Sequence, residues 1–138
     1  MLDVAFGCQD DVSVVFGPSW SGKSVTLKAI AVLERPDAGR IVVDGRVQFD
    51  SAAGIDLPAR ARGVGYLFQD YALFPHMTVE ENIGFPLKPW WQKRASAEIA
   101  RRVGDVIDLF ELRGLERGYP AQLSGGQRQR VALGRALI

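Results

Sequence analysis

Eight residues, Gly17 to Ser24, read GPSWSGKS and impose the tightest structural demand in this sequence of 138 residues. They match the pattern G-x-x-x-x-G-K-[ST], whose glycines let the backbone curve around an anion so that its N–H groups converge on the anion's oxygens. In this pattern Lys23 supplies a positive charge for the β- and γ-phosphates of a nucleotide, and Ser24 supplies a hydroxyl for Mg²⁺. Chance produces the pattern in roughly 0.3% of chains with this length and composition. We therefore predict a loop that binds nucleotide phosphates.

The residues on either side of this loop have the patterns of a strand and a helix. The β-branched run Val12–Phe16 is typical of a buried strand. A helix is expected from about Lys23 to Glu34, ended by Pro36-Asp37, with an apolar face made of Leu27, Ile30, Ala31 and Leu33. The positive end of its dipole would point at the same anion. Strand, glycine turn and helix together indicate an α/β chain.

The segment Leu123 to Gln127 reads LSGGQ and forms a second candidate anion site. Ser124 is the expected N-cap of a last helix that reaches Leu137, and Ser124, Gly125 and Gly126 are expected to expose unpaired N–H groups at its start. Taken alone, the pattern also fits an ordinary Ser-Gly-Gly helix cap. We expect the arginines that follow to form a solvated helix face; they are Arg128, Arg130 and Arg135.

Between the two motifs, local patterns predict a hairpin and two helices. Asp44-Gly45 joins the β-rich runs 41–43 and 46–49, which is typical of a type I′ turn with positive φ at both central residues. Thr78 to Glu81 has the spacing of a capping box and opens a short helix. A longer helix is expected over about 94–110, with an apolar face made of Ile99, Val103, Val106, Ile107 and Phe110. The remaining expectations are a loop over 51–62 and a second buried strand over 64–68.

Composition and charge exclude several classes of protein. Hydrophobic residues make up 47% and charged residues 24%, close to the globular average, which argues against disorder. The formal charge of +1 gives no electrostatic basis for binding nucleic acid. The single cysteine, Cys8, excludes an intramolecular disulfide framework and a multi-cysteine zinc site. No apolar run approaches the ~18 residues needed to span a bilayer, and the N-terminus lacks the long apolar stretch of a signal peptide. We expect a cytosolic domain that can sit on a membrane partner.

Taken together, GPSWSGKS and LSGGQRQR closely resemble the ATP-binding cassette (ABC) ATPases, whose signature sequence is LSGGQ. The resemblance extends over nearly the whole chain. It implies an α/β fold with a P-loop NTPase core, an ABC-type antiparallel β portion and an inserted α-helical subdomain, incomplete at the C-terminus. By this resemblance residues 1–138 form part of a nucleotide-binding domain, with the core at about 1–76 and 119–138 and the helical subdomain at about 77–118.

The resemblance also implies a role for each motif. The Walker A loop would bind ATP through Gly17, Pro18, Ser19, Trp20, Ser21, Gly22, Lys23 and Ser24. Gln69 matches the family's Q-loop glutamine, which contacts Mg²⁺ and the attacking water, so that Ser24 and Gln69 are the implied metal ligands. Family members pair head to tail, and the signature residues would therefore reach the ATP of a second subunit; they are Leu123, Ser124, Gly125, Gly126 and Gln127.

One stretch narrows the resemblance to importers. The residues from Gly39 to Ile83 are similar to the ATPases of bacterial molybdate importers, and only slightly less to those of sulfate and other oxyanion importers. The implied function is coupling of ATP binding and hydrolysis to import of an oxyanion, with molybdate as the expected substrate. The implied partners are transmembrane permease subunits, a second ABC ATPase subunit and, indirectly, a periplasmic binding protein, but no nucleic acid. The implied location is peripheral, on the cytoplasmic face of the bacterial inner membrane.

The sequence departs from the family pattern beyond the signature helix. The Walker B strand with its Mg²⁺-binding Asp and catalytic Glu, the D-loop and the switch histidine have no counterpart among these 138 residues. The one histidine, His76, lies too early in the chain to be the switch and is expected to be a packing or contact residue. No catalytic residue is therefore present, and we expect this chain alone to bind ATP weakly or partially without hydrolysing it.

Several aromatic residues raise separate questions. Phe6 is the only aromatic candidate to stack on adenine ahead of the loop, although packing within a strand over 4–6 is the more expected role. Trp20 stands where the family usually has glycine, and a requirement for positive φ there would cost roughly 1–2 kcal/mol in strain. Trp90 and Trp91 fit docking against a membrane subunit and local packing equally well.

Two other functions also fit the sequence. The first is a non-catalytic remnant that binds nucleotide or pairs with an intact cassette, which the missing Walker B segment and Trp20 favour. The second is a non-transport ABC ATPase that acts on ribosomes or DNA. The nearly neutral charge and the importer-like segment around Gln69 argue against this second alternative.

Overall fold

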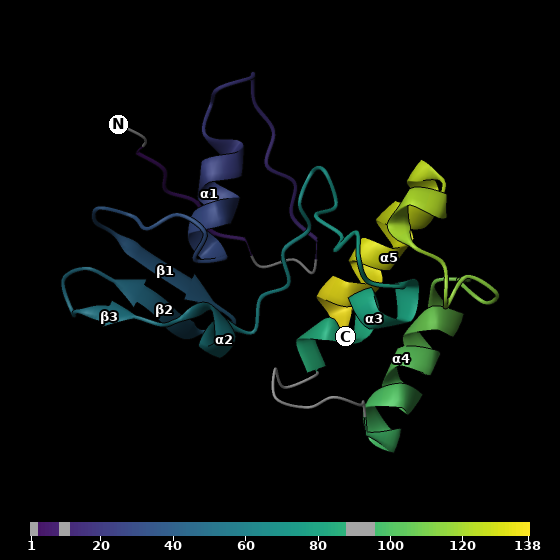
Figure 1. Cartoon of the computed structure of the whole chain (residues 1–138). Helices are drawn as coiled ribbons and strands as arrows, with labels where there is room; N and C mark the ends of the chain where they lie inside the picture. Colours follow the sequence, from purple (N-terminus) through teal and green to yellow (C-terminus); the bar gives the residue numbers. More distant parts are fainter. Residues whose placement is uncertain (1–2, 9–11, 88–95) are drawn as a thin grey trace. The chain divides into compact units, whose positions relative to one another are not determined.

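The computed structural model describes residues 3–8, 12–87 and 96–138. The chain forms two compact units, Met1–Val64 and Gly65–Ile138, which we describe one at a time (Figure 1). The first unit contains α1 (Lys23–Ile30), β1 (Arg40–Val43), β2 (Arg46–Asp50), β3 (Ile55–Asp56) and α2 (Ala59–Arg62). The second unit contains α3 (Val79–Gly84), η1 (Phe85–Leu87), α4 (Ala97–Leu109), η2 (Pro120–Gln122) and α5 (Gly125–Leu137).

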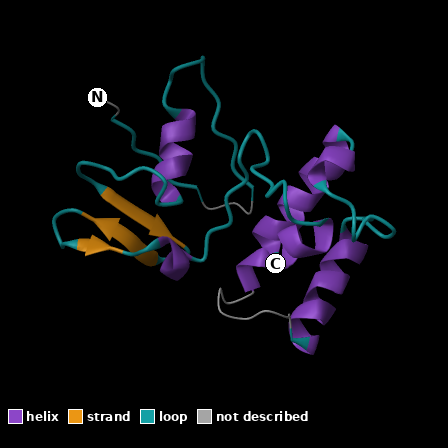
Figure 2. Ribbon diagram, viewed as in Figure 1, coloured by secondary structure: helices purple, strands orange, loops and turns teal. Residues whose placement is uncertain are grey.

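The first unit contains a three-stranded antiparallel sheet in the order β1-β2-β3 (Figure 2). Asp44 and Gly45 connect β1 to β2 with φ values of 50° and 73°. Both values are positive, as a type I′ turn requires, so the predicted hairpin is confirmed. The pairing contains one irregularity, between Ile41 and Val42.

Arg62 joins α1 to the sheet region of the first unit. Its side chain is buried, with an exposed fraction of only 1%. The guanidinium donates to the carbonyls of Ala29 and Ile30 at 3.0 Å each, and Nε donates to the carbonyl of Leu57 at 2.9 Å. A guanidinium at a helix C-terminus also complements the negative end of the helix dipole. Arg62 therefore fixes the end of α1 opposite the GPSWSGKS loop.

Helix α1 is shorter than predicted, because it ends at Ile30 and not near Glu34. Val32 has φ 64°, and the N–H of Leu33 donates to the carbonyl of Lys28 at 2.8 Å. These are the features of a Schellman ending, with Val32 at the left-handed position that glycine usually occupies. The predicted apolar face is only partly covered, since Leu27 and Leu33 remain 47% and 45% exposed.

Three predicted strands and one predicted loop are wrong. Segments 4–6, 12–16 and 64–68 are not strands, and the predicted loop over 51–62 contains β3 and α2. Val12, Val14 and Phe16 are 80%, 86% and 96% exposed, although their run reads as a buried strand. A strand forms only beside a partner that supplies hydrogen bonds, and the sheet found among the described residues is limited to β1, β2 and β3.

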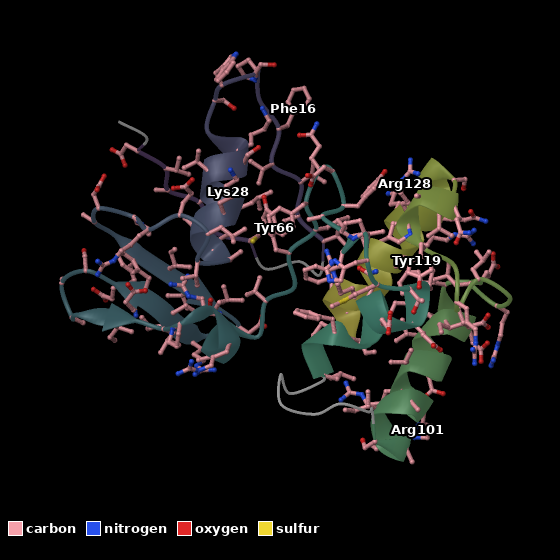
Figure 3. The ribbon with its side chains drawn as sticks, in the orientation of Figure 1. Phe16, Lys28, Tyr66, Arg101, Tyr119 and Arg128 are labelled. Carbon is pink, nitrogen blue, oxygen red and sulfur yellow. The ribbon has the colours of Figure 1, made fainter. Side chains whose placement is uncertain are left out.

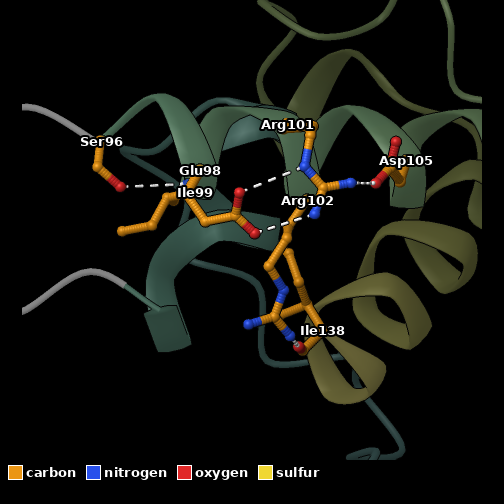
Figure 4. Close-up of polar contacts among 7 residues, drawn as sticks. All are labelled: Ser96, Glu98, Ile99, Arg101, Arg102, Asp105 and Ile138. Carbon is orange, nitrogen blue, oxygen red and sulfur yellow. Dashed lines mark hydrogen bonds and ion pairs between the residues drawn. The ribbon is translucent and has the colours of Figure 1, made fainter.

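The core of the second unit is a helical cluster. Its buried members come from α3, α4, α5 and the segments between them; they are Val79, Ile83, Val103, Ile107, Leu112, Leu123 and Val131. The predicted apolar face of α4 is confirmed, because Val103 and Ile107 are buried and the other three predicted members pack against the cluster. The predicted start of this helix at residue 94 lies outside the described residues. The hydroxyl of Ser96 caps α4 by accepting the N–H of Ile99 at 3.2 Å (Figure 4).

Two predicted helix starts in this unit are confirmed. At α3, the hydroxyl of Thr78 accepts the N–H of Glu81, and the carboxylate of Glu81 accepts the N–H of Thr78 at 2.8 Å, which completes a capping box. At α5, Ser124 is the N-cap as expected. In the part of the chain that the structure describes, no helix has the length and apolar character needed to cross a membrane.

Candidate functional site

The GPSWSGKS loop leads into α1, whose start is suited to an anion. Gly22 is the N-cap residue with φ 89°, a left-handed conformation that favours glycine. No side chain among the described residues caps α1 at this position. The first N–H groups of a helix lack intrahelical partners, and together with the helix dipole they favour a negatively charged ligand. The predicted phosphate loop therefore has the expected local geometry.

The ammonium group of Lys23 lies against the carbonyls of its own loop. Nζ donates to the carbonyl of Gly17 at 2.8 Å, to the carbonyl of Pro18 at 2.6 Å and to the hydroxyl of Ser21 at 3.3 Å. A Cβ built on Gly17 would lie 2.9 Å from the Ser21 hydroxyl oxygen, so the loop closes tightly at this residue. The contacts hold the positive charge within the loop, where phosphate oxygens would replace neutral carbonyls as stronger, charge-assisted partners.

Trp20 has a positive φ, which is the condition under which a tryptophan at this position is strained. Its φ is 70°, and its side chain is fully exposed. The indole therefore buries no surface that would offset the left-handed conformation. Phe16, just before the loop, is also almost fully exposed, and its ring projects from the chain in Figure 3.

The LSGGQ segment forms the start of α5. The hydroxyl of Ser124 accepts the N–H of Gln127 at 3.2 Å, and Oε1 of Gln127 accepts the N–H of Ser124 at 2.8 Å. The prediction of an unpaired N–H group is therefore wrong for Ser124, because a reciprocal capping box with Gln127 satisfies it. Gly125 and Gly126 have open space where a Cβ would stand. They are the part of this helix start that a ligand could approach closely.

The expectation of a solvated arginine face on α5 is wrong in detail, because all three arginines bond to the protein. Arg128, labelled in Figure 3, donates to the carbonyl of Leu123 at 2.8 Å, and Arg130 donates to the carbonyl of Phe110 at 3.2 Å. Arg135 donates to the carbonyls of Ala72 and Tyr71 at 2.7 and 2.9 Å. Burial lowers the pKa of Arg135 from its ordinary value.

Gln69 is exposed. It precedes by two and three positions the residues that Arg135 contacts, Tyr71 and Ala72. The residues after it are fixed by Asn82, a buried residue of α3 that the sequence reasoning overlooked. Its Oδ1 accepts the N–H of Phe74 at 2.9 Å, and its Nδ2 donates to the carbonyls of Phe74, Met77 and Thr78 at 3.0–3.1 Å. The sequence does contain an indication of this role for Asn82. It is a polar residue on the apolar face of a helix, directly after a capping box.

The aromatic and histidine predictions have mixed outcomes. Phe6 is 56% exposed and residues 4–6 do not form a strand, so the predicted packing within a strand is wrong. His76 is exposed, with its ring centroid 6.2 Å from that of Phe74, as expected for a contact residue. Trp90 and Trp91 lie outside the described residues.

The predicted site residues fall into both units. The GPSWSGKS loop belongs to the first unit, whereas Gln69 and LSGGQ belong to the second. Ser24 and Gln69, the implied Mg²⁺ ligands, are therefore in different units. Across residues 3–8, 12–87 and 96–138, no group of three or more His, Cys, Asp or Glu side chains could hold a metal ion. Phosphate oxygens together with hydroxyl or amide oxygens are a donor set that Mg²⁺, a hard cation, accepts.

Comparison with known proteins agrees with the motifs. The family model described as ABC transporter matches residues 4–138. The sulfate/thiosulfate import ATP-binding protein CysA of Caulobacter vibrioides is 52% identical over 99% of this chain and 38% of its own length. The molybdenum import ATP-binding protein ModC of Rhodospirillum rubrum is 48% identical over 99% of this chain and 36% of its own length. The chain thus spans little more than a third of the length of these relatives.

A solved structure has a similar fold. It is the dimeric structure of a post-hydrolysis state of the ATP-binding cassette MJ0796 bound to ADP and Pi. The similarity has a TM-score of 0.66 at 32% sequence identity and covers 87% of this chain and 53% of that chain. The predicted α/β P-loop NTPase fold of the ABC type is confirmed.

Proposed function

The chain belongs to the ABC transporter family, and from that premise we propose that it is the nucleotide-binding part of an ATPase that powers import of an oxyanion. The observation that carries the proposal is the loop geometry at α1. A helix start without a side-chain cap and a lysine ammonium held among the loop carbonyls fit the triphosphate of ATP.

Within this proposal each motif has its own task. Lys23 and the N–H groups of the loop hold the phosphates, and the hydroxyl of Ser24 together with Gln69 would hold Mg²⁺, which neutralises charge on the phosphates when it is bound. Gly125 and Gly126 face the ATP of a second subunit in a head-to-tail dimer, because the absence of a Cβ permits close approach. We retain the division into a core at about 1–76 and 119–138 and a helical subdomain at about 77–118 as part of the same proposal.

Binding of ATP is the first step to test. In the protein as the cell produces it, Lys23→Ala should lower the affinity for ATP by at least about 100-fold, because a charge that meets phosphate directly is removed. The control is Lys28→Ala, which removes a lysine from the opposite end of the same helix (Figure 3). Calorimetric titration should show loss of binding in the first variant and unchanged binding in the second. Equal affinity in both variants would refute the assigned role of Lys23.

The substrate, partners and location are proposals of the same kind. We propose molybdate as the transported oxyanion, with sulfate as the competing candidate, since relatives named for both are similar over 99% of this chain. The proposed partners are permease subunits in the membrane and a periplasmic binding protein, with the chain on the cytoplasmic face. Reconstitution with these partners tests the substrate: ATP hydrolysis should rise with molybdate-loaded binding protein and stay at its basal rate with sulfate-loaded protein.

We also propose that a protein made of these 138 residues alone binds ATP without hydrolysing it. The family's Walker B Asp and Glu and its switch histidine have no counterpart among them. The intact mass of the protein from its own cell separates the cases. A mass well above 15.1 kDa supports hydrolysis by the longer protein, whereas 15.1 kDa supports the non-catalytic remnant.

A further inference from the structure

The turn after Gln69 has an unfavourable backbone conformation. Tyr71 and Ala72 have φ values of 65° and 44°, so two consecutive residues other than glycine are left-handed. Residues with a Cβ seldom adopt this conformation, and they keep it only where surrounding contacts enforce it. Such a turn should relax when its contacts are removed.

The enforcing contacts come from the C-terminal part of α5. The guanidinium of Arg135 donates to both left-handed residues, to the carbonyl of Ala72 at 2.7 Å and to that of Tyr71 at 2.9 Å. Its Cζ also lies 5.3 Å from the ring centroid of Phe74, a cation–π distance. A planar fork with fixed donors suits two neighbouring carbonyls, and a lysine ammonium would not reproduce it.

The chain contacts the C-terminal end of α5 both before and after Gln69. Before Gln69, a Cβ built on Gly65 would lie only 2.3 Å from the carbonyl oxygen of Ala136, so the backbones touch there. After Gln69, Arg135 holds Tyr71 and Ala72. From Phe74 onward the chain is fixed separately by Asn82 on α3. The conformation of 70–72 is therefore the part that depends on Arg135.

We propose that Arg135 is a positioning residue for Gln69: it clamps the left-handed turn at Tyr71–Ala72 to α5, so that Gln69 and the LSGGQ helix move as one body. The functional consequence rests on the proposed ATPase function, in which Gln69 meets Mg²⁺ and LSGGQ meets a second nucleotide. The contacts of Arg135 with Tyr71 and Ala72 lie within the second unit alone. The structural clamp and its effect on ATP hydrolysis can therefore be tested separately.

The clamp is tested by hydrogen exchange of the Tyr71 amide, which donates to the carbonyl of Phe68 at 3.0 Å. In the protein as the cell produces it, Arg135→Met should speed this exchange at least about tenfold, because the turn opens when its two bonds are lost. Arg135→Lys keeps the charge, is the safer variant for folding, and should also speed exchange. Arg101→Ala is the control: its guanidinium bridges Glu98 and Asp105 on the exposed side of α4, and exchange at Tyr71 should not change (Figure 4).

A second substitution separates positioning from general stabilisation. Glycine adopts the left-handed conformation without penalty, and Ala72 is exposed, so that Ala72→Gly removes only a methyl group. Ala72→Gly added to Arg135→Met should return Tyr71 exchange to within about threefold of the wild-type rate. Rapid exchange that persists in the double variant, or exchange at the wild-type rate in Arg135→Met and Arg135→Lys, would overturn the clamp.

The functional arm uses ATP. Arg135→Met should lower kcat for ATP hydrolysis at least about tenfold while the affinity for ATP stays within about twofold, because the phosphate loop lies in the other unit. Ala72→Gly added to Arg135→Met should recover part of the lost kcat. An unchanged kcat in Arg135→Met would refute coupling through Gln69. If the protein from the cell is longer than these 138 residues and the wild type still shows no hydrolysis, the proposed ATPase function fails. The exchange experiment decides the clamp in either case.

Discussion

Trp20 combines a left-handed backbone with a side chain that contributes no burial. Its φ is 70° and its indole is fully exposed. For a residue with a Cβ this conformation costs roughly 1–2 kcal/mol, and no packing offsets the cost. Glycine has no such penalty and would adopt the same loop conformation without strain.

We therefore predict that Trp20→Gly stabilises the loop by about 1 kcal/mol and tightens ATP binding by up to about tenfold. Trp20→Ala is the matched control, since it removes the indole but keeps the Cβ and hence the strain. Calorimetric titration with ATP should rank glycine above both alanine and tryptophan. If alanine and glycine gain equally, the bulk of the indole and not the backbone is the cause.

At the scale of elements, the C-terminal end of α1 contains another residue that, like Trp20, has a left-handed backbone conformation despite its Cβ. Val32 occupies the left-handed position of a Schellman ending with φ 64°, and β-branched residues are rare there. Val32→Gly should raise the free energy of unfolding by about 1 kcal/mol relative to Val32→Ala, because both lose the same branched side chain and only glycine relieves the backbone. Urea unfolding followed by circular dichroism measures the difference. Equal stability of the two variants would contradict the Schellman interpretation.

Two glycines inside helices provide an internally matched test of helix packing. Gly104 in α4 has open space around a built Cβ, whereas a Cβ on Gly134 in α5 would lie 2.9 Å from Val106 Cγ1. Gly104→Ala should stabilise by about 0.5–1 kcal/mol through helix propensity alone. Gly134→Ala gains the same propensity but forces α5 away from α4, so it should destabilise by about 1–3 kcal/mol. Thermal unfolding should move in opposite directions for the two variants, and a shared direction would contradict the close packing.

The elements that the sequence predicted well are those whose cause is local. The Asp44-Gly45 turn, the capping box at Thr78 and the N-cap at Ser124 need only residues within four positions of each other, and all three are confirmed. The start of α1 after the GPSWSGKS loop is local in the same sense, because it depends on Gly22 and its immediate neighbours. The strands expected over 12–16 and 64–68 need partners distant in the sequence, and composition cannot supply them. Arg135 was misjudged for the same reason, because its partners Tyr71 and Ala72 are more than sixty positions away.

At the scale of the whole molecule, the chain assigns its two glycine-bearing helix starts to different units. The GPSWSGKS loop belongs to Met1–Val64, and LSGGQ belongs to Gly65–Ile138 together with Gln69. The second unit depends on its helices for structure, and several of its surface carboxylates are paired. The Arg113 guanidinium lowers the pKa of Asp108, and Arg101 does the same for Glu98. The backbone N–H groups of Glu116 and Gly114 lower the pKa of Glu116.

These shifts predict that acid weakens the helical unit. A carboxyl group whose folded pKa is lowered adds stability above its unfolded pKa, and this stability is lost as the pH falls through the folded pKa. Stability of the second unit should therefore decline between about pH 5 and pH 2, and the decline should be smaller in high salt, which screens exposed pairs. Asp108→Asn removes the carboxylate paired with Arg113 and should flatten the decline. Urea unfolding across this range measures both effects, and parallel curves for wild type and Asp108→Asn would show that the Asp108–Arg113 pair does not stabilise the fold.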